Sequence, residues 1–239
     1  SLRYFFGRTN ATKIDFSEMR MGVSNIAELC SGCASLVEVK NLIIFGDSCD
    51  NLFYNCRALH SIIGAEKWDL SSATTLNRMF YNCTSLQTID VSKWDVSSAI
   101  DISYLFGKCT GLLTINLSNF KLPQQEDAVL SSTFSGVKID LDVSTIKIGK
   151  SLNGLFYSYA GANIYGLENW DTSSVITMQN IFNQREKLVS LNGIENWDTS
   201  SVVNMLGAFN WTRLLTTIPV DDWDVSNVKN MKHMFYKCP

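Results

Sequence analysis

The sequence predicts an α/β solenoid of about nine to ten coils, with a parallel β-sheet on one face and short helices or 3₁₀ turns on the other. Three observations predict it: a motif that recurs about every 25 residues, a second column of aligned tryptophans, and period-2 alternation after each copy of the motif. A unit this short cannot bury its own apolar face, whereas stacked copies can. We therefore expect residues 1–239 to form a single domain.

The recurring motif is F-x-x-C-x-x-L, and it is clearest at Phe53, Phe80 and Phe106. Ten copies share its first position, occupied in order by Phe6, Cys30, Phe53, Phe80, Phe106, Phe134, Phe156, Phe182, Phe209 and Phe235. One copy per coil, at roughly 4.8 Å between neighbouring strands, predicts an array about 45 Å long. Like residues at each repeat position should then form ladders along the core.

A short alternating segment follows each motif. In residues 86–91, Ile89 and Val91 alternate with polar residues, and residues 112–117 and 215–220 repeat this pattern. Apolar residues two apart are typical of a strand that buries one face. We therefore expect one short strand in each coil, paired in parallel with its neighbours.

A Trp-Asp pair marks the turn that leaves each strand. It occurs at Trp68, Trp94, Trp170, Trp197 and Trp223, and Phe120 takes the tryptophan place in another copy. The aspartates and the serines after them favour capping of the next turn. The residues that then lead to the next Phe carry an apolar stripe, such as Val175, Met178 and Ile181, which predicts a short helix or 3₁₀ turn.

The middle and the ends of the chain depart from this frame. Residues 121–127 lack the Trp-Asp pair and contain Pro123, and the copies at Phe134 and Phe156 have no tryptophan between them. We interpret this region as a loop excursion and a compressed coil. The chain begins and ends inside a repeat without a polar cap, so we expect it to be an excerpt of a longer protein.

Composition excludes several classes of function. The chain is 46% hydrophobic and 18% charged, with a net charge of −3 and two histidines. No apolar run approaches the roughly 18 residues of a membrane span, so we expect no membrane insertion from this segment. Nucleic-acid binding would need clustered Lys and Arg, which this nearly neutral sequence lacks, so we expect no nucleic-acid partner. Without a catalytic spacing or a phosphate-binding loop, we expect neither enzyme activity nor a cofactor.

The cysteines admit two interpretations. Five of the seven share one repeat position, namely Cys33, Cys56, Cys83, Cys109 and Cys238. Val137 takes that position in another copy, which favours a column of small buried side chains. The alternatives are disulfides between adjacent coils, or a zinc site at Cys30 and Cys33, which lack a second pair and a nearby histidine.

Three other patterns have a structural and a functional interpretation. The aligned aspartates could bind calcium, but one carboxylate per coil fits turn capping better. The tryptophans could form a strip that binds carbohydrate, but Phe120 in their column favours a buried spine. Sequons begin at Asn10, Asn82 and Asn210, and we interpret them mainly as products of the repeat, with glycosylation as the alternative.

The frame L-x-x-I-D-V-S-x-W-D-V-S-S, closed by F-x-x-C and read across Leu86–Cys109, resembles the BspA-like class of leucine-rich repeats. It is similar to the bacterial surface protein repeat of about 25 residues, also labelled a domain of unknown function in mycoplasma lipoproteins. The resemblance is specific in the Trp-Asp and Met-Phe-Tyr-x-Cys elements of the chain. The resemblance implies a right-handed leucine-rich-repeat superhelix, an extracellular or cell-surface location, and adhesion to host proteins or other cells. It supplies no catalytic residues.

A surface role implies a partner for the solenoid face. We expect a protein or glycan ligand, such as a host matrix or cell-surface protein, to contact the polar residues of the strand face. These residues are Glu38, Lys40, Thr88, Asp90, Ser92, Thr114, Asn116, Ser118, Ser190, Asn192 and Thr217. Two alternatives stay open: a structural or assembly component of a phage particle or cytoskeletal array, and a repeat region attached to a catalytic domain outside this chain.

Overall fold

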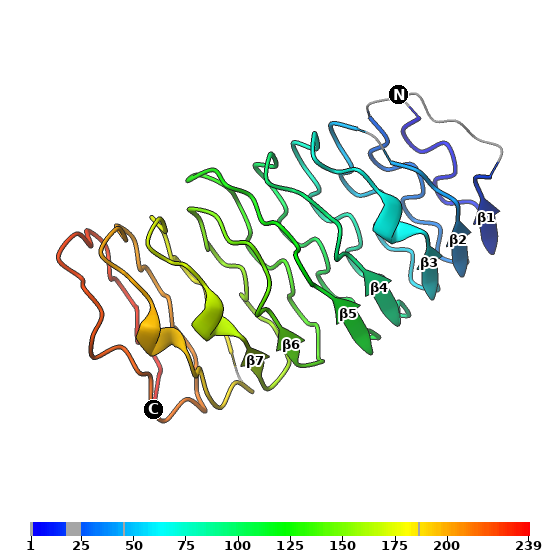
Figure 1. Cartoon of the computed structure of the whole chain (residues 1–239). Coiled ribbons are helices and arrows are strands. Elements are labelled where there is room, and N and C mark those ends of the chain that lie inside the picture. Colours follow the sequence, from blue (N-terminus) through cyan, green and yellow to red (C-terminus); the bar gives the residue numbers. More distant parts are fainter. Residues whose placement is uncertain (1, 18–24, 45, 186) are drawn as a thin grey trace.

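The structure is a computed structural model that describes residues 2–17, 25–44, 46–185 and 187–239. The chain winds in similar coils that lie one behind another, from the N-terminal end to the C-terminal end (Figure 1). The strands of successive coils follow one another along one long side of this stack (Figure 1). None of the described residues lies in an α-helix.

Each strand is only two or three residues long and lies in the alternating segment that follows the motif. The strands are β1 (Lys13–Asp15), β2 (Glu38–Lys40), β3 (Ser61–Ile63), β4 (Thr88–Asp90), β5 (Thr114–Asn116), β6 (Leu141–Asp142) and β7 (Ile164–Tyr165). Among the described residues they form three parallel sheets, in the orders β1-β2-β3, β4-β5 and β6-β7.

The register of these sheets advances by one repeat from strand to strand. Val39 pairs with both Ile14 and Ile62, and Ile89 pairs with Ile115 in the same way. Side chains in a strand alternate between its two faces, so this register stacks the central apolar residues on the inside. The residues on either side of them face outward.

The segments before each Phe form tight turns, where the sequence predicts a short helix or 3₁₀ turn. The backbone N–H of Met79 donates to the carbonyl of Leu76 in its own coil, at 3.2 Å. The next N–H, that of Phe80, instead donates to the carbonyl of Leu105 in the following coil, at 3.0 Å. An α-helix would use these N–H groups internally. Bonding between coils therefore competes with helix formation and replaces it.

Left-handed residues on both sides of the Phe make these turns possible. Around Phe80 they are Arg78, with φ of 54°, and Asn82, with φ of 64°. Glycine and asparagine tolerate this conformation best, which explains why both recur at these places. The position two residues after the Phe is left-handed at Arg8, Gly32, Asn55, Asn82, Lys108, Gly136, Ser158, Gln184, Trp211 and Lys237.

Short 3₁₀ helices occur at a different place from the predicted ones. They are η1 (Ala65–Lys67), η2 (Leu167–Asn169) and η3 (Ile194–Asn196), and each ends just before a tryptophan of the Trp-Asp pair. A left-handed glycine precedes each of them, with φ between 87° and 98°. The chain therefore bends sharply at the glycine, and the single helical turn that follows places the tryptophan in the core.

Two aromatic ladders run along the core. Neighbouring phenylalanines of the motif stack without a break from Phe53 to Phe235, with ring centroids 5.5 to 6.0 Å apart. The tryptophan ladder has two pieces. Trp68 stacks on Trp94 at 5.4 Å, and Trp170 stacks on Trp197 at 5.7 Å. The gap between the pieces coincides with the irregular region around Pro123.

The column tryptophans are buried and hydrogen-bonded, as the spine interpretation predicts. The indole Nε1 of Trp94 donates to the carbonyl of Ala65 in the preceding coil, at 2.8 Å. Trp197 makes the same bond to Leu167, at 2.9 Å. A buried indole N–H needs such a partner. Each tryptophan therefore both fills the core and ties two coils together.

Candidate binding surface

The polar residues predicted for the strand face lie on the outer side of the coils. Of the eleven, Thr88, Thr114, Asn116, Ser118, Asn192 and Thr217 are exposed, and Glu38, Lys40, Asp90, Ser92 and Ser190 are half-buried. The first coils place these residues in or directly after strands. The coils that contain Ser190, Asn192 and Thr217 have no strand there, although the three residues keep the equivalent positions. The structure therefore brings the predicted set to one side without one continuous sheet beneath it.

Strands β4 and β5 form a hollow on this side. Four predicted residues line it: Thr88, Asp90, Thr114 and Asn116. The largely buried Ile62 and Ile89 and the half-buried Ile115 also line it and form its apolar floor. The hollow thus combines hydroxyl, carboxylate and amide groups over an apolar floor. Such a surface suits a protein or sugar ligand.

Two of these residues also hold the backbone turn that follows the strand. Asp90 Oδ1 accepts the N–H of Ser92 at 2.9 Å, and Asn116 Oδ1 accepts the N–H of Ser118 at 3.1 Å. Burial would raise the pKa of Asp90, but the hydrogen bonds from Ser92 outweigh it and hold the pKa below its usual value. The carboxylate thus stays ionised at neutral pH. The predicted residues are therefore part of the turn as well as the surface.

At the N-terminal end the strand face is neutralised by its own charges. Glu38 lies 3.5 Å from the ammonium of Lys13 and 3.3 Å from that of Lys40. Exposed ion pairs of this kind contribute little to stability. Their consequence here is that this part of the face carries no concentrated charge.

A second hollow lies over β7 and the coil after it. It contains the predicted residues Ser190 and Asn192. Sequence reasoning missed the others, which include Tyr165, Glu168 and Glu195. Tyr165 ends β7, and the two glutamates belong to the 3₁₀ turns η2 and η3. The signal that could have found the glutamates is the glycine at 166 and 193 that precedes each turn. This hollow is more acidic than the first.

The cysteine column is a set of free thiols. All seven cysteines are free, and all but Cys238 are buried, as the structural interpretation predicts. Within the column, Cys83 Sγ donates to the carbonyl of Phe53, and Cys109 Sγ to that of Phe80, both at 3.1 Å. Burial raises the pKa of Cys109 to about 12, so this thiol is protonated and unreactive at neutral pH.

The aspartates of the Trp-Asp pairs cap the turn, as predicted. Asp69, Asp171 and Asp198 each accept the backbone N–H of the serine two residues later, at 3.0 to 3.2 Å. The serine hydroxyls also bond to these carboxylates and lower their pKa values. Within the described part of the chain, no cluster of three His, Cys, Asp or Glu side chains has a geometry for a metal ion.

Comparison with known proteins gives one match. No curated protein and no solved structure is similar to this chain at a significant level. Among the described residues no helix is long and apolar enough to cross a membrane. One family model matches in two tandem blocks, residues 47–142 and 150–239, and together they cover most of the chain. The chain therefore belongs to the family described as Mycoplasma protein of unknown function, DUF285.

Proposed function

We propose that this chain is a non-enzymatic binding module that contacts a protein or glycan partner through its strand face. The observation that carries the proposal is the hollow over β4 and β5, where four polar side chains of neighbouring coils converge on an apolar floor. Neither strand needs these outward side chains for its core packing. A repeat array can vary such residues without loss of fold.

An exposed apolar side chain at the edge of this hollow favours a macromolecular partner. Leu113 is 63% exposed and directly precedes Thr114. Apolar contacts surrounded by polar groups are typical of protein interfaces. The polar residues then supply hydrogen bonds, and Leu113 supplies an apolar contact. A host matrix or cell-surface protein fits this combination.

The finer classification is part of the same proposal. We infer that the family blocks are leucine-rich repeats of the BspA-like class and that residues 1–239 form a single solenoid. The coil-to-coil register of about 25 residues and the L-x-x-I-x-L strands support this inference. An extracellular or cell-surface location follows from the resemblance.

Binding to immobilised extracellular-matrix proteins and to a glycan array tests the proposal. We expect saturable binding to at least one of them by the wild-type chain. The double variant Thr88→Lys, Thr114→Lys fills the hollow with two long cations and should weaken that binding at least tenfold. Both residues are exposed, so the variant should keep its fold.

The matched control places the same lysines elsewhere on the coils. Ser72→Lys, Ser98→Lys alters two exposed residues that follow the Trp-Asp pairs and lie outside the strands. It should bind as the wild type does. Equal loss in both variants, or no saturable binding by the wild type, would contradict a strand-face binding role and favour a structural or assembly role.

A further inference from the structure

Arg185 is a buried cation at a position that other coils fill with a neutral residue. It is fully buried in the cysteine column, with its guanidinium carbon 4.2 Å from the centre of the Tyr159 ring. Its Nη1 donates to the carbonyl of Phe156 at 3.0 Å. Its Nε and Nη2 are buried and have no hydrogen-bond partner among the described residues. Leaving a buried charge unpaired is costly, several kcal/mol in typical proteins.

The fold does not require this charge. Cys109 bonds to the carbonyl of Phe80 in the preceding coil, which is the same bond that Arg185 makes to Phe156. A small neutral thiol is therefore sufficient for the column. The cost of the guanidinium in this coil indicates a role outside folding.

The two donors of Arg185 that have no partner among the described residues have a defined geometry. Nε and Nη2 form one edge of the planar guanidinium, while Nη1 is occupied by the backbone carbonyl. Two parallel N–H groups on one edge match the two oxygens of a carboxylate, which they bind in a bidentate manner. The edge left free is thus suited to a carboxylate ligand.

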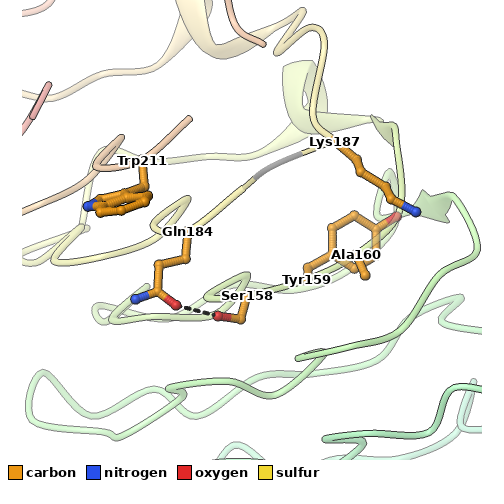
Figure 2. Close-up of a pocket in the computed structure, with 6 residues that line it drawn as sticks. All are labelled: Ser158, Tyr159, Ala160, Gln184, Lys187 and Trp211. Atoms are coloured by element: carbon orange, nitrogen blue, oxygen red, sulfur yellow. Dashed lines mark hydrogen bonds between the residues drawn. The ribbon is translucent and has the colours of Figure 1, made fainter. Parts of the chain in front are cut away.

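A cavity of about 410 Å³ lies beside the coil of this arginine, and Arg185 itself does not line it. Its walls are Ser158, Tyr159, Ala160, Gln184, Lys187 and Trp211. Figure 2 shows Trp211 on one side of it, and Tyr159 and Lys187 on the other. Arg185 follows Gln184 in the chain and stacks on Tyr159, so it lies directly behind two of the walls. Small-molecule sites of roughly 300 to 1,000 Å³ are common.

The surroundings of the cavity are cationic. Lys187 lines it, and Arg213 and Lys237 lie over the Trp211 ring, at 4.3 and 3.9 Å from its centre. In the part of the chain that the structure describes, no carboxylate forms an ion pair with any of these three residues or with Arg185. Lys187, Arg213 and Lys237 are exposed, so their charges are available to an anion from solution, whereas that of Arg185 is buried.

We propose that this cavity binds a small carboxylate, and that the ligand is an acidic sugar of the uronic acid class. The free edge of Arg185 pairs with the carboxylate, and Lys187 adds a second positive charge. The Ser158 hydroxyl and the Gln184 amide oxygen, 3.0 Å apart, offer hydrogen-bonding groups for sugar hydroxyls. Trp211, which is half-buried, provides an aromatic wall for the sugar ring.

Entry of the carboxylate requires a local rearrangement, because the free edge of Arg185 is buried. The three methylene groups of the side chain allow the guanidinium to turn toward the cavity. The inference does not depend on the strand-face proposal, since it concerns different residues and a ligand of different size.

Isothermal titration calorimetry with sodium glucuronate tests the inference, with glucose and sodium chloride of equal ionic strength as reference titrations. We expect saturable binding of glucuronate and none of glucose. Arg185→Cys restores the residue type of the column and should weaken glucuronate binding at least tenfold. The control variant Arg57→Gln changes an exposed arginine several coils away and should bind as the wild type does.

A second variant separates charge from geometry. Arg185→Lys keeps a cation but loses the bidentate edge, and it should also weaken glucuronate binding about tenfold. If Arg185→Cys does not fold, glucuronate binding by Arg185→Lys tests the proposal instead. Absence of saturable glucuronate binding to the wild type, full retention of binding in Arg185→Lys, or tighter binding of inorganic sulfate than of glucuronate would each overturn the proposal.

Discussion

The two family-matched blocks are built from coils of the same design, but different residues occupy the cysteine position of the motif. In the first block the position holds Cys56, Cys83, Cys109 and Val137, whereas in the second block it holds Tyr159, Arg185, Thr212 and Cys238. The phenylalanine ladder beside this column runs through both blocks without interruption. The comparison teaches that the stack depends on the aromatic ladder more strictly than on the identity of the residue next to it.

Several residues at the variable position donate a side-chain hydrogen bond to a backbone carbonyl, whereas Val137 fills it without a donor. Cys109 donates from sulfur to a carbonyl of the preceding coil, and Arg185 does so from nitrogen. Tyr159 uses its hydroxyl, which donates to the carbonyl of Ile139 at 2.5 Å. The carbonyls of Phe80 and Phe156 also accept the backbone N–H three residues later, so they keep a partner without the side chain. The residue type can therefore change if it fills the space, and a side-chain donor is not required.

The largest expected effect comes from placing an arginine in the cysteine column of the first block, as Arg185 is placed in the second. Cys83→Arg should lower the free energy of unfolding by more than about 5 kcal/mol, since an unpaired buried charge costs about 3 to 5 kcal/mol and overpacking adds about 1 to 3. Cys83 is fully buried in a regular coil. Urea denaturation followed by circular dichroism measures the change.

Cys83→Thr is the matched control, because Thr212 fills the same position in the second block. It should cost less than about 1.5 kcal/mol, as a swap of similar volume that keeps a donor. If Cys83→Arg is as stable as Cys83→Thr, then the column tolerates charge in any coil, and Arg185 is not exceptional.

The sequence predicts the regular parts of each coil well, because their patterns report burial directly. The alternation in residues 86–91 places Ile89 inside, and the structure pairs Ile89 with Ile115 in parallel strands. The Trp-Asp pairs likewise predict a buried ring and a capped turn, and both are present at Trp94 and Asp95.

The turns before each Phe could not be predicted in the same way. An apolar stripe such as Val175, Met178 and Ile181 indicates which side chains are buried, but it does not report where the backbone N–H groups bond. Here alternate backbone N–H groups donate to carbonyls of the next coil, which lie about 25 residues away in the sequence. The burial of Arg185 could not be predicted for a related reason. The residues that it contacts, Tyr159 and Phe156, belong to another coil.

A smaller effect is expected from breaking the tryptophan ladder, which in the first block consists of Trp68 and Trp94. Trp94 is fully buried and stacks on Trp68. Trp94→Ala should cost about 3 to 5 kcal/mol. Trp94→Phe should cost only about 1 to 2 kcal/mol, since it keeps an aromatic ring, as Phe120 does in the next coil, and loses the bond to Ala65.

The control for the ladder is a tryptophan outside the column. Trp211 is half-buried in a turn, so Trp211→Ala should cost clearly less than Trp94→Ala in the same urea titration. Equal losses at the two positions would show that ring size, and not membership of the ladder, determines the effect.

The smallest effect concerns the capping aspartates, which differ between the blocks in their partners. Asp95 Oδ1 accepts the N–H of Ser97 at 3.1 Å, and its Oδ2 lies 2.6 Å from the ammonium of Lys121, whereas Asp171 in the second block has no ion pair with a described residue. Burial raises the pKa of Asp95, but the bonds from Lys121 and Ser97 lower it overall.

A carboxyl group whose pKa is lower in the folded state stabilises the fold above its unfolded pKa, near 3.9, and this contribution is lost as the pH falls through the folded value. Asp95→Asn should therefore cost about 1 kcal/mol at pH 7, and the difference from wild type should shrink as the pH falls below the unfolded pKa of the carboxyl group. Asp171→Asn should show the same direction with a smaller change in melting temperature, because its carboxylate is exposed and lacks a lysine. Melting temperatures measured from pH 2 to pH 7 in low salt decide this. A difference for Asp95→Asn that is as large at pH 2 as at pH 7 would show that the side-chain amide disturbs the turn and that the ionised carboxylate contributes nothing.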